Sequence, residues 1–478
     1  METNSGVDAT PLIVDLDGTL SHGDVFWEDL LSEVGGNPMT SGPIFRQMLR
    51  GKAATKHFIS ERAAFDAGHL PYNAAVIDLI DAARRQGRKV YLATGSHVSR
   101  AEAVAAHLGC FDGVFATTIE RNLTDVRKAA FLAEMFGHGG FDYVGNSVAD
   151  IPVWQVARRA YVVAPQGRLT RRLDRQGIVH ERLPERALSR IGVWLRAMRV
   201  HQYSKNVLVF VPMLAAHRFD PATIVACVTA FVAFCLIASS VYLINDLIDI
   251  RADRGHPSKK KRPIPSGLIQ PPAAILASLL LIVLGGAVAA SASLAFAGVV
   301  ASYFVMTLAY STFIKRKMLV DSITLSLLYT ARIAGGAVAA QVVLSSWLTI
   351  FSLFFFTALA LIKRYTELRV RLLQDLADPS NRNYRKEDLT VIGALAAASA
   401  VNSVTVFALY VASPVVAANY TRPWVLGAIC PLLLYLLGRM LMMAHRGEMD
   451  DDPIVFALRD RNWRLAGIVL FAIFVAAI

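Results

Sequence analysis

The sequence predicts an α/β domain followed by an all-α polytopic membrane bundle. Up to about residue 185, short apolar segments that end in polar turns alternate with helical segments. This alternation predicts a parallel sheet with its chemistry at the carboxyl ends of the strands. Beyond residue 206, apolar runs of membrane-spanning length recur. We therefore expect a soluble domain over 1–185, a linker helix over 186–205 and a membrane domain over 206–478.

The membrane domain contains nine candidate spans. Their expected ranges are 206–217, 222–246, 272–291, 294–314, 319–341, 346–362, 389–413, 423–443 and 464–478. The first and last are short for a bilayer, so eight spans remain an alternative.

The charges of the connecting loops predict the orientation. Lys and Arg gather in loops 251–271, 315–318, 363–388 and 444–464, whereas the opposite side carries little beyond Arg218 and Arg422. Such a bias places the basic loops in the cytoplasm. The start of the chain lacks the pattern of a secretory signal, so we expect a cytoplasmic N-terminal domain on an inner-membrane protein. The loops account for the net charge of +12 better than nucleic-acid binding does.

The linker "RALSRIGVWLRAMRVHQYSKN" has an amphipathic pattern. Ile191, Trp194, Leu195 and Met198 recur at helical spacing. The pattern favours an interfacial helix at the membrane surface. A plain amphipathic helix packed on the soluble domain would show the same moment and remains open.

Paired carboxylates end the first strand of the soluble domain, in "PLIVDLDGTL". Asp15 and Asp17 are two residues apart, so their side chains leave the chain close together. Such a pair can hold a divalent cation, and one member can attack while the other handles protons. Thr94 follows a second strand, Lys128 lies on a helix, and Asn146 and Asp150 follow a third strand in "FDYVGNSVADIPVW".

These four motifs, in this order, resemble the haloacid dehalogenase (HAD) phosphatase superfamily over roughly residues 10–165. The resemblance implies that Asp15 forms an aspartyl-phosphate, that Asp17 is the general acid/base, and that residues 21–85 form a small helical cap. It implies that Thr94 and Lys128 bind the phosphoryl group. The implied Mg²⁺ ligands are Asp15, Asp17, Asn146 and Asp150. The family usually has Asp where this chain has Asn146, which offers a carbonyl but no charge. A degenerate phosphatase fold that serves as a docking module is the alternative.

The second acidic motif is "NDLIDIRADRGHPSKKKRP", at the end of the second span. Asn245, Asp246, Asp249 and Asp253 fall within an arc of about 100° on a helix. A face of carboxylates repels itself unless cations bridge it, and Mg²⁺ bound to a diphosphate would do so. The basic cluster that follows can meet phosphate oxygens. The alternative is a solvated helix end whose acids balance the basic loop.

Further polar residues lie within or beside the spans. They are Lys205, Asn206, Tyr310, Lys315, Arg332, Lys363, Arg364, Tyr365, Glu367, Asp460 and Arg461. Arg332 is the most informative, because an arginine within a span normally faces a polar cavity. Tyr310, Lys315 and Arg461 could instead anchor helix ends at the interface.

The NDxxDxxxD motif at a cytoplasmic helix end resembles the UbiA-type intramembrane prenyltransferase superfamily, over roughly residues 190–478. Within it, "HQYSKNVLVFVPMLAA", "ARIAGGAVA", "KRYTEL" and "FALRDR" are similar to decaprenyl-phosphate phosphoribosyltransferases. The resemblance implies a UbiA-like bundle of about nine helices with a Mg²⁺-diphosphate site. The second DxxxD motif of aromatic prenyltransferases is missing from "KRYTELRVRLLQDLADPSN".

The resemblance implies transfer of 5-phosphoribose from 5-phosphoribosyl diphosphate (PRPP) to a polyprenyl phosphate. The implied Mg²⁺ ligands are Asn245, Asp249 and Asp253, of which the two aspartates are also the implied catalytic residues. Substrate contacts are expected from the polar residues above and from Asp246, Arg254, His256, Lys260 and Arg262. The HAD domain would then remove the 5-phosphate of the product. The alternative is transfer of a prenyl group from a prenyl diphosphate, with a regulatory HAD domain. Membrane lipids are further expected partners, nucleic acid is not, and a homo-oligomer is left open.

Overall fold

The computed structural model describes residues 10–36, 40–163, 167–184, 189–379, 382–414, 416, 420–449 and 452–478. The chain divides into two compact units. Unit 1 is Met1–Arg199 with Tyr242–Leu279, and unit 2 is Val200–Val241 with Leu280–Ile478. The expected boundary at residues 185 and 186, and the first nine residues, lie outside the described residues.

Unit 1 contains a six-stranded parallel sheet in the order β3-β2-β1-β4-β5-β6. The strands are β1 (Leu12–Val14), β2 (Val90–His97), β3 (Gly113–Thr117), β4 (Asp142–Gly145), β5 (Arg159–Val162) and β6 (His180–Arg182). Leu12 pairs with Val90 on one side and with Asp142 on the other. The strand order reverses at β1, and ligands of open parallel sheets bind at such a switch point. The predicted α/β fold is confirmed.

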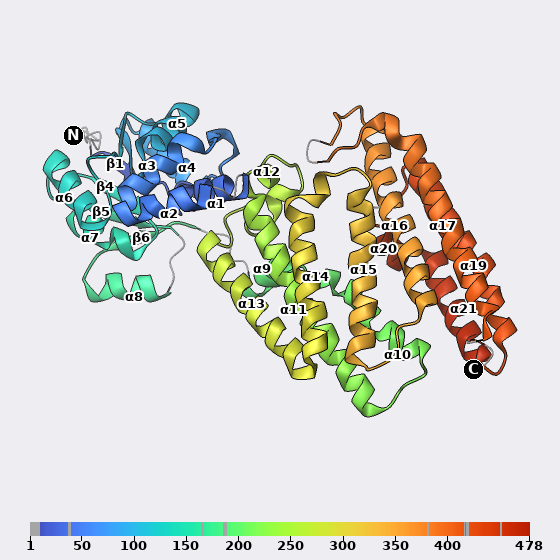
Figure 1. The fold of residues 1–478 in the computed structure, drawn as a ribbon. Coiled ribbons are helices and arrows are strands. Elements are labelled where there is room, and N and C mark those ends of the chain that lie inside the picture. The colour runs from blue at the N-terminus through green and yellow to red at the C-terminus, as the bar shows by residue number, and fades with distance from the viewer. Residues whose placement is uncertain are drawn as a thin grey trace, which may run out of the picture. The chain divides into compact units, whose positions relative to one another are not determined.

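Helices cover both faces of this sheet (Figure 1). They are α4 (Ala74–Arg85), α5 (Val98–Leu108), α6 (Asp125–Phe136), α7 (Ile151–Val156) and α8 (Gly167–Arg175). Alternate residues of β1 point to opposite faces. Leu12 and Val14 therefore belong to one hydrophobic core, and Ile13 belongs to the other. The two flanking cores fix the position of the carboxyl end of β1, which Asp15 directly follows.

The helical cap is smaller than the 21–85 range expected for it. Helices α1 (Val25–Gly36), α2 (Ser41–Arg50) and α3 (Lys52–Arg62) form a separate cluster around Leu30, Ile44 and Ile59. Helix α4 instead joins the core of the sheet through Val76 and Ile80, which lie four residues apart on one helical face. The cap therefore consists of α1–α3.

The rest of unit 1 consists of α9 (Arg190–Ala197), α12 (Ile250–Arg254) and the adjoining ends of two long helices, α11 (Pro221–Ile248) and α13 (Pro271–Ala292). Unit 2 is helical. Its remaining helices are α10 (Val211–Ala215), α14 (Leu294–Thr312), α15 (Val320–Ala339), α16 (Ser346–Leu373), α17 (Leu389–Val411), α19 (Ile429–Arg446), α20 (Pro453–Arg459) and α21 (Arg461–Ala477).

Seven helices in the described part of the chain are long and apolar enough to cross a membrane. The chain is therefore an integral membrane protein, but the expected count of nine spans is not confirmed. The first expected span forms the 3₁₀ segment Val200–Phe210 followed by the short α10. The last, α21, has only 17 residues. Both fall short of the roughly 20 residues that a bilayer-spanning helix needs.

Candidate active sites

The first candidate site lies at the carboxyl ends of β1 and β2. Asp17 accepts hydrogen bonds from Ser96 Oγ at 2.6 Å and from the Val25 N–H at 2.8 Å, and Thr94 Oγ1 lies 3.5 Å away. The predicted pair of Asp17 and Thr94 is therefore brought together. Ser96 was not predicted, although its place two residues after Thr94 on the same strand could have indicated it.

Asp15 lies in a buried network with Lys128. The Lys128 ammonium donates to Asp15 Oδ1 at 2.8 Å and to Tyr143 Oη at 2.9 Å. Tyr143 in turn donates to Asp150 Oδ1 at 2.8 Å. Tyr143 was missed because it reads as an ordinary aromatic core residue of β4. This network joins three of the four predicted motifs, and the hydrogen bond from Thr94 to Asp17 adds the fourth.

Burial sets the proton affinities of the two aspartates. It raises the pKa of Asp15 to about 7, against the opposing effect of Lys128. It raises the pKa of Asp17 to about 6, where Asp24 adds to the effect and the Ser96 hydrogen bond opposes it. Burial alone would favour neutral Lys128, but Asp15 and Asp150 outweigh it and raise its pKa. Asp17 can therefore hold or release a proton near neutral pH.

The oxygen atoms around this loop fit a magnesium ion. Gly18 has φ +72°, and a Cβ there would lie 2.1 Å from Asn146 Nδ2, so the glycine lets the Asn146 amide approach the first motif. Asp15, Asp17 and Asn146 offer the hard oxygen ligands that Mg²⁺ prefers. Asp150 accepts from the N–H groups of Asn146 and Ser147, which orients the fourth motif. In the described part of the chain, no three His, Cys, Asp or Glu side chains form a ready metal cluster.

The second candidate site, also in unit 1, is the acidic end of α11. The Asp249 N–H donates to Asn245 O at 2.9 Å, and the Asp253 N–H donates to Asp249 O at 2.8 Å. The helical path therefore continues from α11 into α12 and keeps these acids four residues apart, as the sequence predicts. Their carboxylate and amide oxygens fit Mg²⁺ by ligand type.

Arginines contact the acids of this second site. Arg262 Nη1 lies 2.6 Å from Asp253 Oδ2 and 3.2 Å from Asp246 Oδ1, and Arg199 Nη2 lies 2.5 Å from Asp246 Oδ1. Asp246 and Asp253 are almost completely buried. Arg262 was predicted to meet phosphate, and in this arrangement it binds the acids themselves. For a metal-bound diphosphate to bind here, Arg262 would have to exchange its carboxylate partners for phosphate oxygens.

Arg254 has a different partner from the one expected. Its guanidinium binds both carboxylate oxygens of Glu28, on cap helix α1, at 2.5 and 2.6 Å, and its Nε donates to Pro265 O. Both side chains are about 95% buried. Of the two other predicted residues of this loop, His256 Nδ1 contacts Ser258, and Lys260 is exposed. Arg254 thus joins the acidic motif to the cap within unit 1.

Unit 2 holds three polar clusters within its helices. The first surrounds Arg332, which donates to Asn206 Oδ1 at 2.8 Å, to Tyr303 Oη at 2.7 Å and to Leu328 O at 2.7 Å. The three acceptors are neutral, so these hydrogen bonds leave the guanidinium charge uncancelled. An arginine held in this way inside a span is suited to a buried anion.

The second cluster gathers Lys205 and Lys363 around one carboxylate. The Lys205 ammonium lies 2.6 Å from Asp452 Oδ2, and the Lys363 ammonium lies 3.8 Å from it. Burial acts to raise the pKa of Asp452, but the two lysines outweigh it and lower the pKa. Two positive charges thus share one negative charge. Asp452 was missed because its place before the short α20 suggests only a helix cap.

The third cluster surrounds Asp321, which is fully buried at the start of α15. Arg364 Nε lies 2.8 Å from it, Arg382 lies 3.1 Å away, and Tyr384 donates to it at 2.5 Å. Arg364 also binds Glu367 at 2.7 Å. Asp321 was not predicted, although an acid at the start of a span is a recognisable signal.

The other predicted residues of unit 2 lie near these clusters or apart from them. Tyr310 Oη is 3.4 Å from Arg364, so it belongs to the third cluster. Tyr365 instead contacts His445 at 2.8 Å, and Asp460 pairs with Arg439 at 2.9 Å while it caps α21. Lys315 lies in the 3₁₀ turn Ile314–Arg316, and Arg461 opens α21.

Comparison with known proteins identifies the membrane domain. A family model described as the UbiA prenyltransferase family matches residues 207–477, more than half of the chain. The chain belongs to this family.

Relatives of known sequence extend the comparison. The uncharacterized protein y4nM of Sinorhizobium fredii is 36% identical over 473 residues, which cover 98% of this chain and 91% of y4nM. That protein therefore shares both halves. Decaprenyl-phosphate phosphoribosyltransferase of Mycobacterium tuberculosis is 32% identical over 292 residues, or 59% of this chain and 93% of that protein. The nodulation protein NoeC of Azorhizobium caulinodans is 32% identical over 267 residues, or 56% of this chain and 87% of NoeC.

Two solved structures are distant matches. A UbiA homolog from Archaeoglobus fulgidus bound to GPP and Mg²⁺ has a TM-score of 0.45 and 15% identity, with 60% of this chain and 99% of that chain covered. A probable phosphoserine phosphatase from Vibrio cholerae has a TM-score of 0.27 and 12% identity, with 37% and 64% covered. In this UbiA-family chain, the HAD-like character of unit 1 rests on its own sheet order and on the positions of its HAD-like motifs.

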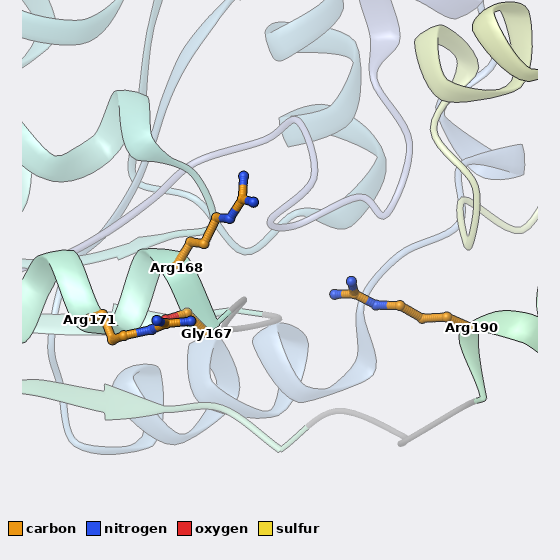
Figure 2. Close-up of a pocket in the computed structure, with 4 residues that line it drawn as sticks. All are labelled: Gly167, Arg168, Arg171 and Arg190. Carbon is orange, nitrogen blue, oxygen red and sulfur yellow. The ribbon is translucent and has the colours of Figure 1, made fainter.

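One pocket of this UbiA-family protein is separate from both candidate sites of unit 1. Figure 2 shows it, with Gly167, Arg168 and Arg171 of α8 on one side and Arg190 of α9 on the other. The three arginines are exposed, and the chain that links α8 to α9 includes residues outside the described part. We assign no role to this pocket.

Proposed function

We propose that this UbiA-family protein is a Mg²⁺-dependent transferase that moves 5-phosphoribose from PRPP to a polyprenyl phosphate. We propose further that the phosphatase site of unit 1 removes the 5-phosphate of the product. The observation that carries the transferase proposal is that cations gather in several separate clusters. These are Arg332, the pair Lys205 and Lys363, and the arginines beside Asp246 and Asp253. A prenyl donor presents one diphosphate, whereas PRPP and a polyprenyl phosphate together present a diphosphate and two further phosphates. The similarity to decaprenyl-phosphate phosphoribosyltransferase supports the same substrates.

In the proposed transfer, the bond between ribose C1 and the diphosphate breaks and a bond from C1 to an acceptor phosphate oxygen forms. Asn245, Asp249 and Asp253 would hold Mg²⁺, which would neutralise charge on the departing diphosphate. Arg262 would exchange its carboxylate partners for diphosphate oxygens. The acceptor phosphate is already an anion, so the step needs no strong base. Arg332, with neutral partners, and the two lysines around Asp452 are suited to the remaining phosphates.

In the proposed hydrolysis, Asp15 attacks the phosphorus of the 5-phosphate and Asp17 protonates the departing ribose oxygen. Water then attacks the aspartyl-phosphate, with Asp17 as the base, and releases inorganic phosphate. Lys128 at 2.8 Å holds Asp15 and would neutralise the phosphoryl oxygens. Asp15, Asp17 and Asn146 would hold the metal, which would reduce repulsion between the phosphoryl group and the attacking carboxylate.

The second candidate function is prenyl transfer from a prenyl diphosphate, which the family description favours. It would use the same acidic motif. It gives no role to the Lys205 and Lys363 cluster, since one diphosphate would be served by the cations beside Asp246 and Asp253. The basic loops support a cytoplasmic location for the N-terminal α/β domain, on the side where PRPP is found.

Product analysis with labelled donors tests the proposal. Membranes that contain the protein are supplied with polyprenyl phosphate and either labelled PRPP or a labelled prenyl diphosphate. We expect lipid label only from PRPP, and its loss in Asp249→Asn. Asp15→Asn should still label lipid but accumulate the 5-phosphorylated product. Label from the prenyl diphosphate alone would reject the transferase proposal, and identical lipids from Asp15→Asn and the parent would reject the phosphatase proposal.

A further inference from the structure

Helix α1 of the cap packs against α12, the short helix that carries the end of the second acidic motif. Both helices belong to unit 1. Arg251 and Arg254 are three residues apart, so they lie on one face of α12, and both bind side chains of α1. Asp253 lies on a different face and binds Arg262. The cap therefore holds α12 from the side that its acids do not use.

The pair of Glu28 and Arg254 forms the centre of this contact. Both carboxylate oxygens of Glu28 accept hydrogen bonds from the guanidinium, at 2.5 and 2.6 Å, and both side chains are buried. Gly23 makes room for the pair, since a Cβ there would lie 2.0 Å from Glu28 Oε1 and 2.8 Å from Arg254 Nη2. A pair with two parallel hydrogen bonds fixes the direction of the guanidinium as well as its position. Glu28 therefore sets how α12 lies against α1.

The loop that follows α12 is attached to the same part of the chain. Arg254 Nε donates to Pro265 O at 2.7 Å. Arg262, three residues before Pro265, contacts the acids of the motif. Near the end of the loop, Gln270 Nε2 donates to His22 O at 2.6 Å. The positions of α12 and of Arg262 thus depend on residues of the N-terminal domain.

Glu28 also cancels a positive charge beside the predicted metal ligands. Arg254 directly follows Asp253, which is one of those ligands. An unpaired guanidinium at this position would repel Mg²⁺ and compete with it for the carboxylates. Arg251 is held less completely, because its partner Asp29 also pairs with an arginine of α5. Among the cap residues that bind α12, Glu28 is therefore the one whose loss should disturb the motif most.

We infer that Glu28 is a positioning residue of the transferase site, through which the cap of the N-terminal domain holds the diphosphate-binding acids in place. The N-terminal domain is then a structural part of the transferase as well as the carrier of a second site. This inference rests on the proposed function only in that the acidic motif binds a Mg²⁺-diphosphate. It applies equally to PRPP and to a prenyl diphosphate.

Calorimetry on the full-length protein in detergent tests this role. The probe is Mg²⁺ with methylenediphosphonate, a diphosphate analogue that is not hydrolysed, and Asp249→Asn identifies the heat that comes from the acidic motif. We expect Glu28→Gln to weaken binding by about tenfold and to raise the Mg²⁺ concentration required, because groups behind metal ligands typically contribute about 10- to 100-fold in metal affinity. If Arg254 is instead a phosphate ligand, Glu28→Gln frees it and binding tightens. Tighter or unchanged binding would overturn the inference.

Two further variants separate positioning from a general loss of structure. Glu33→Gln is the matched control, because Glu33 is a half-buried acid on the same helix, and it should keep the affinity of the parent. Glu28→Met combined with Arg254→Met removes both charges, so it should bind the analogue more tightly than Glu28→Gln, which leaves a guanidinium unpaired. A double variant that binds more weakly than Glu28→Gln would mean that the two residues act independently, against the inference.

Arg254→Lys provides a test that leaves Glu28 with a counter-charge. Lysine keeps the positive charge but cannot form two parallel hydrogen bonds to one carboxylate. We expect the melting temperature to stay close to that of the parent, and the analogue to bind severalfold more weakly. Binding as tight as that of the parent would show that the geometry of the pair does not position the acids.

Transfer assays in membranes distinguish this inference from the proposed function. If Glu28→Gln weakens binding of the analogue but the parent transfers no phosphoribose, Glu28 positions the acids and the proposed donor is wrong. If the parent transfers phosphoribose while Glu28→Gln keeps the KM for PRPP and the Mg²⁺ requirement of the parent, the proposed function stands and this inference fails.

Discussion

The proposed phosphatase site of unit 1 and the polar clusters of unit 2 gather their charged groups in different ways. In unit 1, one lysine, Lys128 at the start of α6, lies among the buried acids Asp15 and Asp150, which belong to short motifs that follow strands. In unit 2, cations gather around single acids or neutral groups, and their partners come from nearby helices, as with Arg364 and Asp321, or from distant segments, as with Lys205 and Asp452. A parallel sheet therefore gathers functional side chains at one edge, whereas a helical bundle gathers them wherever buried charges find partners.

Removal of the proposed nucleophile should have the largest effect. Asp15→Asn should lower phosphatase activity by about 10⁴-fold or more, as expected for removal of a nucleophile. Phosphoribosyl transfer should continue, because Asp15 belongs only to the motif edge of the sheet. Phosphate release and lipid labelling, measured on the same preparation, check both halves. A parallel loss of transfer would mean that the two activities are not separable.

The next expected effect concerns the acidic end of α11. Asp253→Asn should lower transfer by about 10²- to 10³-fold, through loss of a charged oxygen at the developing diphosphate. Phosphatase activity on a soluble phosphomonoester should change little. Measuring the transferase rate against Mg²⁺ concentration tests this role, since the variant should need a higher Mg²⁺ concentration than the parent. An unchanged Mg²⁺ requirement would remove Asp253 from the metal site.

Breaking the buried pair of Glu28 and Arg254 should also lower stability. Glu28→Ala leaves a buried guanidinium without its carboxylate, at a cost of about 3–5 kcal/mol. Glu33→Ala on the same helix is the control, because Glu33 is only half-buried. Thermal unfolding in detergent measures both variants. Equal melting temperatures would show that the pair contributes nothing to the folded protein.

The smallest expected effect is a pH dependence of stability. Burial raises the pKa of Asp17 to about 6, above its unfolded value of 3.8. The folded state therefore binds the proton more tightly, so its contribution to stability is present at low pH and is lost as pH rises from about 4 to about 6. Without divalent metal, the melting temperature should fall over this range, and the fall should be shallower in Asp17→Asn. An identical profile for the variant would contradict the assignment.

Much of the proposed phosphatase site follows from local sequence. Asp15, Asp17, Thr94 and Lys128 were predicted from the order of their motifs, and the structure brings them together. Ser96 and Tyr143 were missed, because a serine and a core tyrosine carry no distinctive pattern. The narrower cap also escaped prediction, since the apolar stripe of α4 suits either a cap or a sheet.

The sequence determined the two fold classes, the acidic face at the end of α11 and the unusual position of Arg332 within a span. Those features depend on periodicity, apolar length and the spacing of charges along one segment. The partners of the buried charges are set by packing alone. They are Glu28 for Arg254, Asp452 for Lys205 and Lys363, and Asp321 for Arg364. The physical reason is that a buried charge requires a counter-charge or hydrogen-bonding groups close to it in space, and packing can bring these from any part of the chain.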